Sequence, residues 1–312
     1  MFEISPAFVL AGLFVGFVVG LTGMGGGALM TPALVFFFNV NPLTAISSDV
    51  VTSLFMKPAG AIVHIVRKTA HLPLVFWLCV GSVPAAFIGA ILVDQLRAFA
   101  GFESILLTIL GVALLITSGG LILRAWSTMV RYHSVAGEGP TSPQRPEIEV
   151  RRALTVLLGA LGGLLVGLTS VGAGSLIITL LLMVYPRLKP SQLVGTDLVQ
   201  AIPLVASASL GHLLFGEVSF ELTFALLIGA IPGTFLGAQV SSRAPGGIIR
   251  RALAILLMAS GLKLVGAPTE AVLIASGGAI IIGPVVWAVL RRRFRGTRAA
   301  PTGSEVEGDL KR

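Results

Sequence analysis

Long hydrophobic runs, separated by short polar breaks, make up most of this 312-residue chain. A membrane-crossing helix needs about 20 apolar residues, so the pattern predicts an all-α polytopic membrane protein. The predicted helices cover residues 6–22, 28–38, 43–66, 72–96, 103–124, 152–169, 175–185, 190–215, 219–243, 247–266 and 271–290. The second and seventh runs are short. Each is therefore expected either to cross as a thin or broken span, or to re-enter and return to the side it came from.

Composition agrees with this pattern. Hydrophobic residues form 55% of the chain and charged residues 12%, and the mean hydropathy is +0.95. A soluble protein of this length needs far more charge to cover its surface. The net charge of +8 comes from Arg and Lys in the polar breaks and the tail, with no soluble basic domain that would indicate nucleic-acid binding. One cysteine, Cys79, and four scattered histidines predict no internal disulfide, no metal site and no cofactor.

The chain also repeats itself in a constant register. The glycine-rich phrase GLTGMGGGA at 20–28 returns as GLTSVGAGS at 167–175, an offset of 147 residues. After a one-residue insertion the offset is 148, and it holds through Gly, Pro, Asp and His positions. Matched pairs include Pro42 with Pro190, Asp49 with Asp197, His64 with His212, Gly81 with Gly229, Pro84 with Pro232, Gly89 with Gly237 and Ala90 with Ala238.

This register predicts a duplication. The expected organisation is a first transmembrane repeat at 1–124, a cytoplasmic linker at 125–151, a second repeat at 152–266, an extra helix at 267–290 and a basic cytoplasmic tail at 291–312. With the linker inside, the other basic breaks also fall inside, as the positive-inside rule requires. The outer breaks carry Glu103, Glu217 and Glu270, with Arg97 as the exception. Each half has five crossings, or three if the glycine-rich segment re-enters. Both numbers are odd, so the halves form an inverted repeat of the kind found in secondary transporters.

The two glycine-rich phrases are the first candidate site. Glycine lets backbone N–H groups turn toward a ligand, and a helix that begins there points its positive dipole end at that place. Irregular backbone at membrane depth occurs where it is buried in protein or lines a cavity. The alternative is close helix packing through small residues, which is favoured for the isolated Gly89 and Gly237. The candidate anion-binding residues are Thr22, Gly23, Gly25, Gly26, Gly27, Thr169, Ser170, Gly172, Gly174 and Ser175.

A second group of candidates follows each phrase. Asp49, Ser53 and Lys57 are spaced four residues apart and share one helix face. Ionisable residues within a span usually face a polar cavity, where Lys57 would attract an anion. The alternatives are that Lys57 snorkels or neutralises an Asp, and that Asp49 and its repeat cap their helices. The candidates are Ser48, Asp49, Thr52, Ser53 and Lys57 in the first half, and Thr196, Asp197 and Gln200 in the second.

Two further matched pairs leave their roles open. His64 and His212 would relay protons if they lined a cavity, or would be hydrogen-bonded at helix ends. Pro84 and Pro232 stand in the middle of predicted spans, where each removes a backbone hydrogen bond. They serve either as hinges or only to shape the helices.

These residues resemble the sulfite exporter TauE/SafE family, also called the TSUP anion permeases. The resemblance rests on GLTGMGGG at 20–27 with Pro32, on AISSD at 45–49 with Thr52 and Ser53, and on their second copies at 167–174 and 195–197. It covers about residues 7–266. It implies transport of sulfite, sulfoacetate or related organosulfonates across a bacterial inner membrane, by a duplicated four-helix unit. This chain departs from that pattern with five runs per half, and with Ser170 and Ala173 where many members have glycine.

The sequence thus predicts a multi-pass secondary transporter rather than an enzyme, with a small anion and the lipid bilayer as partners. Without an ATP-binding motif, the driving force is expected to be protons, the membrane potential or the anion's own gradient, and the direction export. A passive anion channel is the alternative. A membrane-embedded enzyme subunit is disfavoured because the histidines are too dispersed. The first half is expected to hold the anion and the second to complete the cavity.

Overall fold

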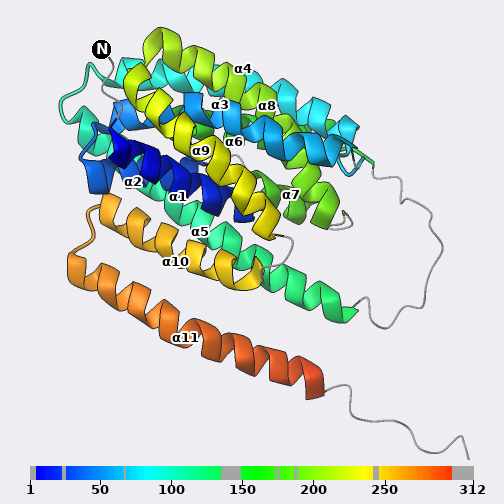
Figure 1. The fold of residues 1–312 in the computed structure, drawn as a ribbon. Helices are drawn as coiled ribbons and strands as arrows, with labels where there is room; N and C mark the ends of the chain where they lie inside the picture. The colour runs from blue at the N-terminus through cyan, green and yellow to red at the C-terminus, as the bar shows by residue number, and fades with distance from the viewer. Residues whose placement is uncertain are drawn as a thin grey trace, which may run out of the picture.

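The computed structural model describes residues 5–22, 26–66, 68–134, 149–172, 174, 176–185, 188, 190–241 and 246–296. The regular structure in these ranges is α-helical, and Figure 1 shows it as a bundle. The helices are α1 (Pro6–Thr22), α2 (Gly27–Phe38), α3 (Pro42–Val66), α4 (Leu72–Leu96), α5 (Phe102–Ser134), α6 (Arg152–Thr169), α7 (Leu176–Val184), α8 (Pro190–Phe215), α9 (Phe220–Ser241), α10 (Gly246–Leu264) and α11 (Thr269–Gly296).

Each helix lies on one of the predicted apolar runs, and most ends agree within a few residues. The all-α prediction is confirmed. Among the described residues, five helices (α4, α5, α6, α8 and α9) are long and apolar enough to cross a membrane. The largest difference is at α5, which continues to Ser134, ten residues into the segment expected to be linker. Residues 125–134 contain no Gly or Pro, so nothing in their backbone chemistry ends the helix.

The two short helices belong to hairpins. α2 has 12 residues, about 18 Å, and α7 has 9, about 14 Å, both well below the thickness of about 30 Å of a bilayer core. The ring of Phe8 in α1 lies 5.0 Å from that of Phe38 in α2, so α2 returns to the end where α1 begins. Likewise Tyr185, just after α7, bonds Thr155 near the start of α6. Two antiparallel crossings would meet in the same way, so these contacts establish the hairpins, and the short second arms favour the re-entrant alternative over five crossings per half.

The helices pair across the two halves. α1 packs along α9, and α4 along α6. Within the repeat register, α1 corresponds to α6 and α4 to α9, so each pair contains one helix from each half. Both pairs are parallel, and the end of α4 lies beside the start of α9, where Arg97 meets Glu217. α1 and α6 therefore run in opposite directions, which supports the predicted inverted repeat.

Glycines bring these paired backbones into contact. A Cβ atom added at Gly12 or Gly16 of α1 would collide with the backbone of α9, and one at Gly159 or Gly163 of α6 would collide with α4. Small residues of this kind allow the close approach that stabilises helix pairs in a membrane. The same contacts are made by Gly89, Gly237 and their neighbours, which confirms the packing interpretation of those isolated glycines.

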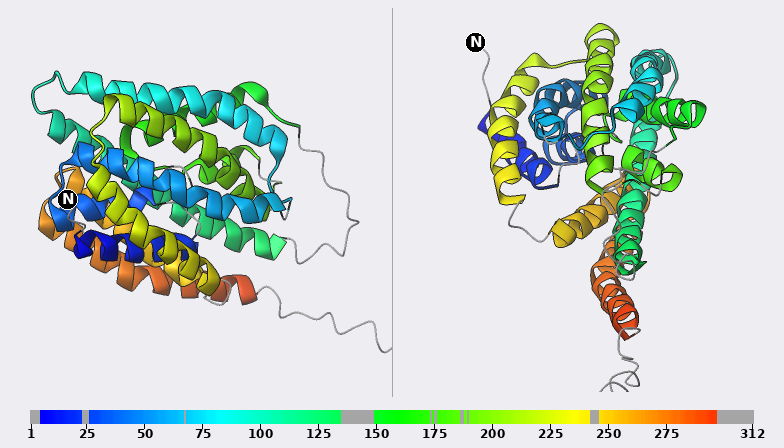
Figure 2. Two further views of the ribbon diagram at one scale, coloured as in Figure 1. Left: turned by 45° about the horizontal axis from the view of Figure 1, so that its top comes forward. Right: turned by 90° about the vertical axis from the view of Figure 1, so that its right-hand side faces the viewer.

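α3 lies between two hydrophobic cores. One core gathers side chains of α1, α2, α5, α9 and α10, and the other gathers those of α4, α6, α7 and α8. α3 contributes Met56 to the first and Val50 to the second, and it also packs along α8. The end-on view in Figure 2 shows α11 at the edge of the bundle, beyond α10. α3 therefore packs directly against α2 of the first hairpin, whereas the second hairpin packs against α4, α5 and α8.

Candidate functional site

The site is built around the buried carboxylate of Asp49. This residue lies on α3, about 10 Å along the axis from its first residue, and it is completely buried. Thr31 Oγ1 of α2 donates a hydrogen bond to Asp49 Oδ2 at 2.7 Å, and Ser53 Oγ lies 3.5 Å from Oδ1. Ser170, which follows α6, lies against Gly27 at the start of α2, and its hydroxyl is near enough to act on the same carboxylate. Asp49 therefore contacts both hairpins at once.

N-capping does not explain the two aspartates. α3 is capped by Asn41, whose Oδ1 accepts the backbone N–H of Leu43 at 2.9 Å. Asp49 lies about two turns further along the helix. Asp197 occupies the same place on α8, inside the helix and fully buried. The capping alternative is therefore wrong, because both carboxylates are held within their helices rather than at the ends.

The two glycine-rich breaks touch each other beside Asp49. A Cβ atom at Gly27 would overlap the backbone of Ser170, and one at Gly26 would lie 3.4 Å from Ser53 Oγ and 3.6 Å from Asp49 Oδ1. The absence of a side chain at Gly27 is what allows the hairpins to meet. Because α2 begins at Gly27, the positive end of its dipole lies in this polar region.

The second break is shaped by unusual backbone conformations. Ser170 ends α6 in the left-handed region at φ 60°, and Gly172 follows at φ 122°, a conformation that favours glycine. The hydroxyl of Thr169 accepts the N–H of Val171 at 3.2 Å, and Gly174 N–H donates to the Gly172 carbonyl at 2.9 Å. These local bonds hold the turn from which the Ser170 hydroxyl reaches Asp49.

Lys57 lies further along α3 and is 7% exposed. Its ammonium is within electrostatic range of Asp197 and of Asp49. It does not snorkel, and the alternative that it neutralises aspartate fits its position. On the far side, Gln200 Nε2 lies 3.5 Å from Asp197 Oδ1, and Ser82 Oγ of α4 donates to Gln200 Oε1 at 3.2 Å. Two carboxylates from the two halves therefore flank a single cation.

Several predicted residues bond elsewhere. Thr22 Oγ1 donates to the carbonyl of Val18 in its own helix, and Thr52 Oγ1 donates to that of Ser48. Two others bond the backbone just before another helix begins. Ser48 Oγ accepts the N–H of Ser219, before α9, at 3.1 Å, and Thr196 Oγ1 accepts that of His71, before α4, at 3.0 Å. Gly23, Gly25, Ser175 and the side chain of His64 lie outside the described part of the chain.

His212 has hydrogen bonds at both ring nitrogens. Nε2 lies 2.7 Å from the carbonyl oxygen of Gly167, which only accepts, so Nε2 carries the proton. Nδ1 then accepts from Ser47 Oγ at 3.0 Å, and Ser47 Oγ in turn accepts the N–H of Glu217 at 3.2 Å. This neutral ring ties the last turn of α8 to α3 and α6. The geometry matches the predicted hydrogen bonding at a helix end, and the proton relay stays a prediction.

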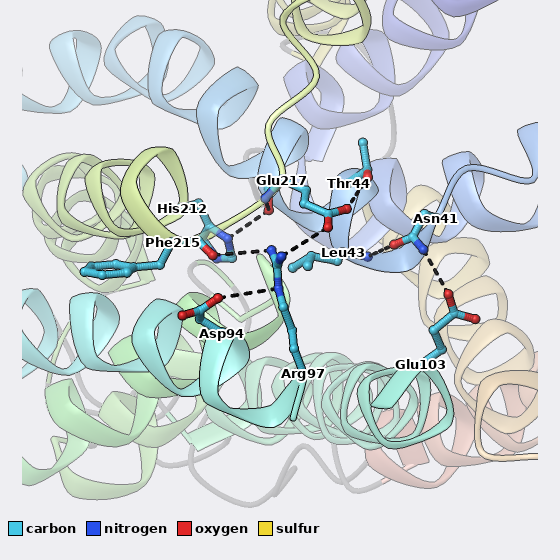
Figure 3. Close-up of polar contacts among 10 residues, drawn as sticks. Asn41, Leu43, Thr44, Asp94, Arg97, Glu103, His212, Phe215 and Glu217 are labelled. Atoms are coloured by element: carbon cyan, nitrogen blue, oxygen red, sulfur yellow. Dashed lines mark hydrogen bonds and ion pairs between the residues drawn. The ribbon is translucent and has the colours of Figure 1, made fainter. Parts of the chain in front are cut away.

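An ion-pair network lies at one end of the bundle, beside His212 (Figure 3). Arg97, just after α4, lies 3.1 Å from Glu217 and 3.6 Å from Asp94, and its Nη2 donates to the carbonyl of Phe215 at 3.3 Å. Thr44 Oγ1 at the start of α3 donates to the other oxygen of Glu217 at 3.3 Å. The network joins α4 to the corner between α8 and α9.

Sequence reasoning missed two residues that support the site, Thr31 and Ser82, and named Ser47 beside Asp49 without assigning it a role. Each stands inside a run counted as apolar, and each makes its bond to a residue far away along the chain. A hydroxyl inside an apolar run was the one signal available. It does not identify the partner, because many such hydroxyls bond their own helix instead.

Comparison with known proteins agrees with this geometry. The family model described as "Sulfite exporter TauE/SafE" matches residues 8–264. A probable membrane transporter protein of Bacillus subtilis, YjnA, is 37% identical over 265 residues, covering 84% of this chain and all of the relative. A second from the same organism, YunE, is 27% identical, covering 82% of this chain and 96% of the relative. A probable membrane transporter of Methanocaldococcus jannaschii is 26% identical, with 82% and 94% covered. No solved structure matches.

The family model spans nearly all of the apolar chain, including both hairpins and the buried cluster around Asp49. The relatives are membrane transporters rather than enzymes, and the described helices are those of a multi-pass membrane protein. The chain belongs to the sulfite exporter TauE/SafE family and is a membrane transporter.

Proposed function

We propose that this transporter is a secondary permease that exports small sulfur-containing oxyanions, such as sulfite, sulfoacetate or another organosulfonate, from the cytoplasm. The anion binds between the tips of the two hairpins, beside α3. The observation that carries this proposal is the convergence there of hydroxyl donors from both hairpins, a helix N-terminus and one buried cation, Lys57. These are the groups that hold oxyanions in proteins.

The anion site draws on both halves of the chain. Thr31 and Ser53 belong to the first half, while Ser170 belongs to the second. A site shared by two oppositely directed hairpins is accessible from either end if the hairpins move relative to α3, as alternating access requires. The matched Pro84 and Pro232 lie in the middle of α4 and α9, the helices to which the hairpins are packed.

Charge at the two ends of the bundle favours export. At one end the described charged residues are basic except for Glu149, and at the other they are acidic except for Arg97 and Lys263. The positive-inside rule places the basic end in the cytoplasm, together with the C-terminus, and a basic mouth raises the local concentration of anions. The basic set is Lys68, Arg151, Arg152 and Arg251, and the acidic set is Asp94, Glu103, Glu217, Glu221 and Glu270.

Uptake by proteoliposomes tests the function. Purified protein is reconstituted, and labelled sulfite, sulfoacetate, thiosulfate and sulfate are offered with and without a pH gradient. We expect a sulfur oxyanion to accumulate above equilibrium when a gradient is imposed. Equilibration without accumulation under every gradient would identify a passive anion channel instead.

The position of the site is tested separately. Gly26→Leu places a branched side chain between Ser53 and Asp49 and is expected to abolish uptake. Gly277→Ala on α11 is the control, since an added Cβ there meets no atom within 4 Å. Unchanged uptake by the Gly26 variant would rule out the proposed position.

A further inference from the structure

The carboxylate of Asp49 lies where the hydroxyl donors of the proposed anion site meet. Thr31 from α2, Ser53 from α3 and Ser170 after α6 all direct hydroxyls at it. A carboxylate and a sulfur oxyanion accept the same kind of hydrogen bond. With Asp49 ionised, these donors are already satisfied by a tethered anion. A substrate anion in this place therefore competes with Asp49 for the same hydroxyls.

The charges around Asp49 strengthen this competition. Its neighbours from α2 and from the break after α6 are neutral hydroxyls, and its charged neighbour is Lys57 from its own helix. Asp197 of α8 faces Lys57 as well. Asp49, Asp197 and Lys57 are all buried, so an ionised Asp49 already places a negative charge where the substrate anion would bind. Adding an anion to such a dehydrated site is strongly unfavourable unless a positive charge enters with it.

We propose that Asp49 carries the coupling proton of transport, so that an anion and a proton bind together. The proton neutralises the carboxylate, which releases the three hydroxyls to the anion and gives Asp49 an O–H that also donates to it. When the anion leaves, the proton leaves with it and the hydroxyls return to Asp49. This inference rests on the proposed anion transport and adds the identity of the coupling ion and of its carrier. Because a proton leaves with each anion, export runs down the outward gradient of the anion itself, and an inward proton gradient opposes it.

Asp49 suits this role better than Asp197. The partner seen at Asp197 Oδ1 is the amide of Gln200, which is itself held by Ser82 of α4. Asp49, by contrast, is bonded by Thr31 of the first hairpin and lies near the hydroxyl of Ser170 in the second. Protonation of Asp49 therefore changes the contact between the hairpins, which couples proton binding to their movement.

The experiment uses labelled sulfoacetate in proteoliposomes. Its carboxylate and sulfonate both stay ionised across neutral pH, so any pH dependence belongs to the protein. For the wild type we expect a pH gradient to drive accumulation and an acidic medium to raise the apparent affinity. Asp49→Asn mimics the neutral carboxyl. It is expected to lose gradient-driven accumulation, and the sulfoacetate exchange that it retains between equal pH values is expected not to vary with pH.

Asp94→Asn, at the exposed end of α4, is the control and should behave as the wild type. Gradient-driven accumulation by Asp49→Asn would overturn the proposal, as would a wild type that exchanges sulfoacetate with no pH dependence. A wild type that moves none of the sulfur oxyanions would instead refute the proposed function itself.

Thr31→Val keeps the proposal testable if Asp49→Asn fails to fold. Removing this donor makes the ionised carboxylate less favourable. The pH profile of sulfoacetate exchange is therefore expected to move toward higher pH. A reduced rate with an unmoved profile would assign Thr31 a structural role and contradict the proposal.

Discussion

The two hairpins come from repeated sequence, yet they bring different groups to α3. The first contributes space, because Gly26 and Gly27 let α2 begin directly against the neighbouring backbone. The second contributes a side chain, because Ser170 replaces a glycine of the first phrase and its left-handed backbone presents a hydroxyl to Asp49. After duplication the copies have become complementary rather than equivalent. The polar groups of the site are consequently shared between the halves.

The largest effect is expected from Lys57→Met. Removing one partner of a buried ionic group costs about 3–5 kcal/mol, because two carboxylates then remain without a cation. We expect a large fall in melting temperature in detergent, together with loss of transport.

Double variants show which half Lys57 serves. Lys57 lies within electrostatic range of both Asp197 and Asp49, so adding either Asp197→Asn or Asp49→Asn to Lys57→Met should restore part of the lost thermal stability. The aspartate whose replacement restores more is the one that Lys57 mainly neutralises, and no recovery with either would contradict the ionic role of Lys57.

Gly27→Ala comes next. The added methyl would overlap the backbone of Ser170, and such overpacking costs about 1–3 kcal/mol. We expect a lower melting temperature and loss of most uptake. Gly119→Ala on α5 is the matched control, since a Cβ there meets no atom within 4 Å. Equal effects of the two substitutions would show that the hairpins are not in contact.

Gly172→Ala tests the second hairpin. Its φ of 122° is unfavourable for alanine, although the nearest side-chain atom would be 3.8 Å away. A non-glycine residue in a sparsely populated backbone region costs about 1–3 kcal/mol, and without a steric clash we expect the lower part of that range. Thermal unfolding of Gly172→Ala and Gly27→Ala under the same conditions measures the difference in their stability. A larger loss of thermal stability for Gly172→Ala than for Gly27→Ala would contradict this prediction.

The smallest effect on stability is expected at the exposed end. Arg97→Gln removes a partly exposed ion pair with Glu217, and such pairs contribute about 0–1 kcal/mol. The melting temperature should hardly change, and the small difference should shrink further at high salt. A substantial loss of stability would show that this network closes the bundle more firmly than its exposure suggests.

Most of the fold could be predicted from the apolar runs, since each run of sufficient length became a helix near its expected bounds. The hairpins could not, because a short run is equally consistent with a broken span and a re-entrant arm. That choice depends on contacts such as Phe8 with Phe38, which no local pattern encodes. The end of α5 was missed because all of 125–151 was assigned to the linker, although the Gly and Pro residues of this stretch begin only at Gly137.

Part of the site was predictable for a physical reason. Burying a charge inside an apolar run costs free energy unless the charge is compensated. Asp49, Lys57 and Asp197 could therefore be identified as candidates from the sequence. Hydroxyls carry no such cost, because each can bond its own helix. Thr22 and Thr52 do so, whereas Thr31 does not. The sequence contains no signal that separates these cases, since the difference lies in which helix is adjacent.

The glycine contacts that pair α1 with α9, and α4 with α6, also determine when during synthesis each helix can meet its partner. Gly12 of α1 packs against Leu226 of α9, more than 200 residues later in the chain. At about 5–20 residues per second, α1 is made roughly 10 to 40 s before its partner. During that interval its glycine face has only lipid beside it. The first half made alone would leave both α1 and α4 without their partners, so the duplicated unit can no longer act as a transporter by itself.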